Sequence, residues 1–109
     1  MLVGDAGYWK DPLSVHGLTD ALRDAELAAR AIHEVLDDGA DEATALGAYQ
    51  SSRDALAVPL LQVTDQMAGY EWDTPRIRAL LLELADVMRP EVGLLRGLGE
   101  YEPTAAAAA

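Results

Sequence analysis

The chain has 109 residues with no cysteine and no phenylalanine, and its formal net charge is −11. This length allows at most one domain with a modest core, and the missing cysteines exclude disulfides, thiolate chemistry and cysteine-based zinc sites. Because a surface this acidic repels phosphate backbones, nucleic acid is not expected as a partner. No apolar run reaches the length of a membrane span and no basic segment precedes an apolar one at the N-terminus, so we expect a cytoplasmic chain without a membrane span or secretory signal.

The N-terminal segment, residues 1–17, is expected to carry the function. The apolar pair Leu2-Val3 predicts the end of a short strand, and Gly4-Asp5 predicts a turn, because glycine adopts backbone angles that are closed to other residues. Pro12 restricts the residue before it to extended angles, so a helix cannot begin earlier. A loop that leads into a helix N-terminus presents unpaired N–H groups and partial positive charge. Such an arrangement binds anionic or electron-rich groups.

These residues also resemble a family motif. Gly4-Asp5-Ala6, then Lys10-Asp11-Pro12 and Gly17-Leu18, lead into a helix that begins Asp20-Ala21-Leu22-Arg23-Asp24-Ala25-Glu26. This pattern is similar to the second FAD-contact motif of FAD-dependent monooxygenases of the aromatic-hydroxylase type, and the later helices resemble the C-terminal region of the same family. The resemblance implies an FAD-contacting C-terminal segment. In the complete enzyme, such a segment would serve the oxidation of a small organic substrate by O2, with NAD(P)H as the reductant of the flavin.

The resemblance implies a set of cofactor contacts. Asp5 would hydrogen-bond the ribityl or pyrophosphate region of FAD, and the backbone from Pro12 to Leu18 would border the flavin ring. The residues expected at the cofactor are Gly4, Asp5, Ala6, Pro12, Ser14, Val15, His16, Gly17 and Leu18.

No catalytic residue and no metal ligand is assigned from the sequence. A lone loop histidine such as His16 is more often exposed or structural than an acid–base group. Lys10 is expected to be a surface charge or a partner of Asp11. The acidic run Asp37 to Glu42 lacks the register of a calcium loop.

The Gly-rich dinucleotide motif and βαβ unit that the family carries N-terminal to this region do not occur in the chain. Catalysis by the chain alone is therefore not expected, and either the missing N-terminal part or a second copy of the chain is a candidate partner. The alternative hypothesis is a stand-alone acidic helical module for interaction or dimerisation, without catalytic activity. Retention of FAD by the purified chain would separate the two.

The rest of the chain predicts an all-α fold, with three to four helices after a strand remnant and cofactor loop. Helices are expected at 18–36, at 41–70 with a kink at Pro59, at 74–88 and at 90–98, separated by a break at Arg89-Pro90. Residues 100–109 are expected to form a disordered tail. The first helix should face the core with an apolar stripe of Leu18, Leu22, Ala25, Ala29, Ile32 and Leu36.

Two ion pairs are expected on these helices. Glu26 and Arg30 have the i,i+4 spacing of a favourable helical pair. Arg53 interrupts the apolar stripe of the second helix, which comprises Leu46, Tyr49, Leu56, Leu60, Val63 and Met67. Since a charge on an apolar seam must be paired or reach solvent, we expect an Arg53–Glu26 contact that locks the two helices together.

Overall fold

A computed structural model describes residues 1–99, and this part of the chain is helical and contains no strand, as the all-α prediction required. Helix α1 spans Gly17–Leu36, α2 spans Glu42–Ala68 and α3 spans Thr74–Gly97. Two 3₁₀ turns precede them, η1 at Gly4–Ala6 and η2 at Pro12–Ser14. The tail predicted at 100–109 lies outside the described residues. None of the three helices combines the length and apolar character needed to cross a membrane.

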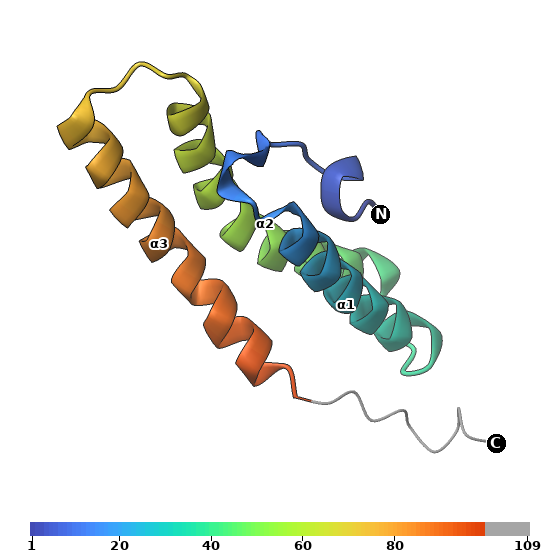
Figure 1. The fold of residues 1–109 in the computed structure, drawn as a ribbon. Helices are drawn as coiled ribbons and strands as arrows, with labels where there is room; N and C mark the ends of the chain where they lie inside the picture. Colours follow the sequence, from blue (N-terminus) through green and yellow to red (C-terminus); the bar gives the residue numbers. More distant parts are fainter. Residues whose placement is uncertain (100–109) are drawn as a thin grey trace.

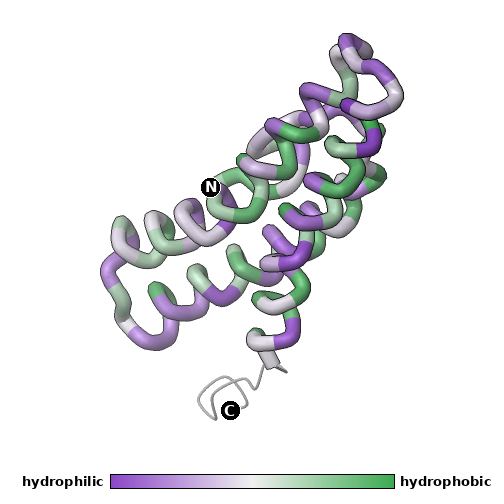
Figure 2. Tube along the Cα trace, turned by 90° about the vertical axis from the view of Figure 1, so that its left-hand side faces the viewer, coloured by the Kyte–Doolittle hydropathy of each residue, from purple (hydrophilic) through white to green (hydrophobic). Residues whose placement is uncertain are grey.

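Helix α2 is the central element of the fold. It packs against α1 on one side and α3 on the other, and it runs antiparallel to both (Figure 1). The N-terminal segment with η1 and η2 lies over the start of α1 and against α2. Hydrophobic and hydrophilic positions are interspersed along the helices (Figure 2).

The helices begin at capping residues that the sequence largely identifies. The Asp41 side chain caps α2 by accepting from the Thr44 backbone N–H at 2.9 Å. The pair Thr74-Pro75 predicts a cap at Thr74, but the cap of α3 is Asp73, which accepts from the Arg76 N–H at 2.9 Å. Helix α1 is followed by Gly39, whose φ of +71° is the left-handed conformation expected of a glycine that ends a helix.

The break predicted at Arg89-Pro90 does not occur. Helix α3 continues through Pro90 to Gly97, and α2 likewise continues through Pro59. A proline inside a helix removes one backbone hydrogen bond and costs about 3 kcal/mol, so packing on both sides must hold the helix together. Leu60 is buried next to Pro59, and Glu91 is buried next to Pro90. These tertiary contacts override the local signal.

The strand predicted at residues 1–3 is also wrong for the described chain. Val3 has an extended backbone, with φ −129° and ψ 141°, but no strand pairs with it within residues 1–99. The segment instead lies on the helices. The Tyr49 hydroxyl donates to the Leu2 carbonyl at 2.8 Å, and Val3 packs on Ala28, Ala31 and Tyr49.

Helix α1 presents the opposite face to the one predicted. Its apolar stripe points outward, with Leu18 and Leu36 each 75% exposed and Leu22 65% exposed. The residues it buries are Asp20, Arg23, Asp24, Ala28 and Ala31. The apolar residues of α1 do lie on one face, as their spacing predicts, but the face toward the core carries small and charged residues.

The predicted stripe of α2 does face the core. Tyr49, Leu56, Leu60, Val63 and Met67 are all buried. Val63 and Met67 form an apolar cluster with Leu80 of α3, and the partly buried residues packed on it are Trp72, Ile77, Leu84 and Val87.

The two predicted ion pairs have different outcomes. Glu26 and Arg30 are joined at 2.7 Å, as predicted. The Arg53–Glu26 bridge is wrong, because Arg53 pairs with Asp54 at 2.7 Å and its guanidinium lies 5.9 Å from the centre of the Tyr8 ring. Arg53 therefore holds the N-terminal segment on α2 and does not join α2 to α1.

Candidate functional site

The candidate site is a hollow beside the N-terminus of α1, which we call the N-terminal hollow. Its volume of about 470 Å³ lies within the range of small-molecule and cofactor sites. It is lined by Asp5, Trp9, Lys10, Asp11, Pro12, Ser14, Val15, Gly17 and Leu18. Residues from η1, from η2 and from the first turn of α1 thus meet at one place.

Six of the nine residues predicted to contact a cofactor line this hollow, namely Asp5, Pro12, Ser14, Val15, Gly17 and Leu18. The other three, Gly4, Ala6 and His16, are not on its wall. Asp5 is exposed on the wall of the hollow. The hollow is therefore open to a ligand at the predicted carboxylate.

Gly4 serves the fold. It is buried with a φ of +57°, and a Cβ atom at this position would lie 3.1 Å from the Ala21 Cβ. Its backbone N–H donates to the Asp24 carboxylate at 3.2 Å. Only glycine satisfies both the backbone angle and the close approach to α1, so the prediction of an unusual backbone at Gly4 is confirmed.

Three features of the hollow suit an electron-rich ligand. The N-cap residue His16 makes no side-chain capping bond, which leaves the first-turn N–H groups of α1 available. The Ser14 hydroxyl oxygen is buried without a hydrogen-bond partner among residues 1–99. Val15 adopts a left-handed backbone with φ +52°, which is strained for a β-branched residue. Unsatisfied polar groups and strained backbone both concentrate at binding sites.

The apolar part of the wall is unusually exposed. Trp9 is 68% exposed, and Val15 and Leu18 are even more open to solvent. A flat aromatic ring packed against such side chains would remove them from water, at about 25 cal/mol per Å² of apolar surface.

A buried group of charged side chains lies next to the hollow, and we call it the ion cluster. It consists of Lys10, His16, Asp20, Arg23, Asp24 and Glu91, all buried. Arg23 is at its centre: its guanidinium donates to Asp20 at 2.8 Å, to Asp24 at 2.7 Å and to Glu91 at 2.8 Å. Each carboxylate is thereby paired, as burial of charge requires.

The remaining members of the cluster connect it to the N-terminal segment. The Lys10 ammonium donates to the second oxygen of Asp20. His16 Nε2 lies 2.5 Å from Glu91 Oε2, and this contact joins the start of α1 to the second half of α3. The Tyr8 hydroxyl accepts from Arg23 at 3.1 Å.

Burial changes the acid–base properties of this region. Burial lowers the pKa of Lys10, and the neighbouring positive charge of Arg23 lowers it further. Burial raises the pKa of Tyr8 against the opposing hydrogen bond from Arg23. For Arg23 itself, burial acts to lower the pKa, but the hydrogen bonds to Asp24 and Tyr8 outweigh it and raise the pKa.

Three members of the cluster also have the chemistry of metal ligands. One ligand atom each from His16, Asp20 and Glu91 lie within 4.8 Å of one another. However, Arg23 donates to both of these carboxylates and Lys10 donates to Asp20. A cation would have to compete with charges that already neutralise the group, so the arrangement is one of paired ions.

Trp9, Lys10 and Asp11 also line the hollow, although they were not among the predicted cofactor contacts. Lys10 was expected at the surface or paired with Asp11, and this is wrong, because it is buried and paired with Asp20. A signal for the ion cluster was present in the spacing Asp20, Arg23 and Asp24, which places three charges on one side of a helix. The partner Glu91 is 68 residues from Arg23 in the chain. No local pattern indicates such a contact.

Comparisons of the chain with protein-family models, with curated proteins and with solved structures find no match.

Proposed function

We propose that this chain is an FAD-contacting segment of a flavin-dependent monooxygenase, with the N-terminal hollow taking the isoalloxazine ring. The observation that carries the proposal is the meeting of six predicted contact residues around one hollow of about 470 Å³. The six residues were predicted from the motif resemblance, whereas the hollow is a feature of the folded structure.

The chemistry of the hollow supports a flavin. Free N–H groups at the start of α1 and the partial positive charge of the helix end stabilise negative charge by about 0.3–1 kcal/mol, and more in a partly buried site. The unpartnered Ser14 hydroxyl could donate to a ring carbonyl, and the exposed Asp5 carboxylate could accept from a ribityl hydroxyl. When bound, FAD would supply the redox chemistry, and this chain would supply position and electrostatics.

A titration of the purified chain with FAD, followed by flavin fluorescence, tests the proposal. Leu18→Glu places a negative charge on the wall of the hollow at a position that is 75% exposed, and it should weaken binding by roughly tenfold. Leu36→Glu is the matched control, since Leu36 is equally exposed at the other end of the same helix. Failure of the wild-type chain to bind FAD, or equal weakening by both variants, would contradict the proposal.

A second candidate function is a helical interaction module, and the outward apolar stripe of α1 favours it. Leu18, Leu22, Ile32 and Leu36 are all exposed along one helix. Exposed apolar surface of this extent marks interaction sites in soluble proteins. A chain that forms dimers in sedimentation equilibrium, loses them on Leu22→Glu and binds no FAD would favour this second function over the first.

A further inference from the structure

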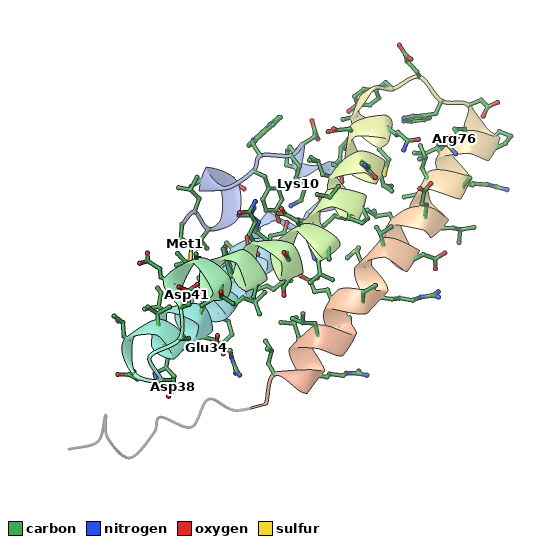
Figure 3. All side chains as sticks on the ribbon, turned by 180° about the vertical axis from the view of Figure 1, so that it is seen from behind. Met1, Lys10, Glu34, Asp38, Asp41 and Arg76 are labelled. Atoms are coloured by element: carbon green, nitrogen blue, oxygen red, sulfur yellow. The ribbon has the colours of Figure 1, made fainter. Side chains whose placement is uncertain are left out.

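Lys10 belongs to both features of the N-terminal region. It lines the N-terminal hollow, and its ammonium is paired with Asp20 inside the ion cluster. The other charged side chains on the wall, Asp5 and Asp11, are negative. Lys10 is thus the single cationic side chain that the described residues place on the wall. Figure 3 labels Lys10, where the N-terminal segment lies against the helices.

We propose that Lys10 contacts the flavin ring in the hollow and stabilises the negative charge that the ring carries in its reduced state. This inference rests on the proposed function and deepens it by naming the residue that tunes the cofactor. Lys10 would contact the cofactor directly, and Asp20 would act as a positioning residue through it.

The surroundings of Lys10 fix its position. An ammonium has three N–H donors, and Asp20 accepts one of them. The Tyr8 ring lies 5.0 Å from the Lys10 nitrogen, within the distance of a cation–π contact. Asp20 is in turn held by Arg23 at 2.8 Å, and Arg23 is held by Glu91 of α3. The side chain is therefore preorganised, with 5% of its surface exposed and one hydrogen bond from its ammonium, to Asp20, among the described residues.

A negatively charged ligand in the hollow would be stabilised by the positive charge of Lys10. When bound, a flavin would supply the redox chemistry, and in its reduced form it would carry negative charge in one region of the ring. A fixed donor aimed at this region acts where charge develops and needs no reorganisation. The first-turn amides of α1 and Lys10 lie on the same hollow, so their effects on this charge would add.

The test is to measure the dissociation constants of oxidised FAD and of dithionite-reduced FAD under anaerobic conditions, by NMR titration of the 15N-labelled chain. The wild-type chain should bind reduced FAD more tightly. Lys10→Met should lower the ratio of the Kd for oxidised FAD to the Kd for reduced FAD by about tenfold. The variant removes a charged hydrogen bond that strengthens binding of the reduced cofactor only. Lys10→Arg should keep the ratio, since it keeps the charge.

Two further variants make the result decisive. Arg30→Met removes a positive charge from α1 away from the hollow and should leave the ratio unchanged. Circular dichroism checks folding, and if Lys10→Met does not fold, the ratio is taken from Lys10→Gln, which can still donate to Asp20.

The outcomes separate this inference from the proposed function. Absence of FAD binding by the wild-type chain would overturn both. Binding with an unchanged ratio in Lys10→Met would overturn the role of Lys10 alone. An equal loss of affinity for both redox states would place Lys10 at the phosphates or in the fold, and it would overturn the inference as well.

Discussion

The ion cluster at the start of α1 and the apolar cluster between α2 and α3 stabilise the same chain by different means. The apolar cluster packs Val63 and Met67 against Leu80, and each side chain there contributes in proportion to the surface it buries. The ion cluster buries six titratable side chains, with Arg23 at the centre, and each charge depends on its partners.

The two clusters differ in how they relate to the candidate binding site. Buried ion pairs contribute little net stability compared with apolar packing, so their presence calls for another explanation. Only the ion cluster shares a residue with the N-terminal hollow, namely Lys10. The ion cluster thus places charged residues, which stabilise the fold less than apolar packing, next to the candidate binding site. The apolar cluster contributes only to the stability of the fold.

The largest expected effect comes from removing the centre of the ion cluster. Arg23→Met leaves Asp20, Asp24 and Glu91 without a shared partner in a buried region, and it should lower the free energy of unfolding by about 3–5 kcal/mol. Urea denaturation followed by circular dichroism measures the loss. Arg30→Met, which breaks a half-exposed pair on the same helix, is the matched control and should cost about 0.2–0.5 kcal/mol. Equal losses would show that the cluster does not act as a unit.

The apolar cluster should respond to truncation in a more graded way. Leu80→Ala removes a side chain that is 1% exposed, and it should cost about 2–5 kcal/mol through lost burial and an unfilled cavity. Leu82→Ala, two residues along and 70% exposed, should change the stability by no more than about 0.5 kcal/mol. Thermal unfolding compares the two. A larger loss from the exposed position would mean that α3 is rotated about its axis.

A smaller effect is expected at an exposed charge, the Asp41 cap of α2. The hydroxyl and the backbone N–H of Thr44 both donate to this carboxylate and hold its pKa below the ordinary value of 3.8. The stabilisation is therefore complete above this ordinary value and is lost as the pH falls through the lower pKa of the folded chain. Asp41→Ala should lower the unfolding midpoint in urea at pH 7, and the gap to wild type should close in acid. A gap that is independent of pH would contradict this role.

The smallest effect is expected on the outward face of α1. Leu22→Gln should change stability by less than about 0.5 kcal/mol, because the side chain is 65% exposed. If the stripe faced the core, as its pattern suggests, the same substitution would be strongly destabilising. Ala28→Leu on the opposite, buried face should instead cost about 1–3 kcal/mol through overpacking. Urea denaturation of the two variants decides which face of α1 is buried.

Much of the fold follows from local signals. The stripe of α2, the cap at Asp41, the glycine at position 39 and the Glu26–Arg30 pair all depend on residues close in sequence, and the structure has each of them. Pro90 shows the limit of such signals. Its tendency to end a helix is local, but the burial of Glu91 against α1 is not.

The candidate site could be predicted only in part for the same reason. The motif resemblance named most of the residues around the hollow, because loop and helix start are adjacent in the chain. His16 is paired with Glu91 of α3, which approaches it only when the helices pack. Lys10 is paired with Asp20, ten residues along the chain, and no local pattern selects this partner over Asp11. The apolar stripe of α1 predicts that this face is buried. It does not show that the rest of the same chain leaves the face exposed.

The central claim, that the N-terminal hollow receives the ring of FAD, is tested most directly by NMR of the 15N-labelled chain during addition of oxidised FAD. The amide signals of Asp5, Lys10, Ser14, Val15 and Gly17 should shift with one common dissociation constant, while those of the apolar cluster at Val63 and Leu80 should stay in place. Unchanged spectra at millimolar FAD, or shifts spread over α2 and α3 with none around the hollow, would contradict the account.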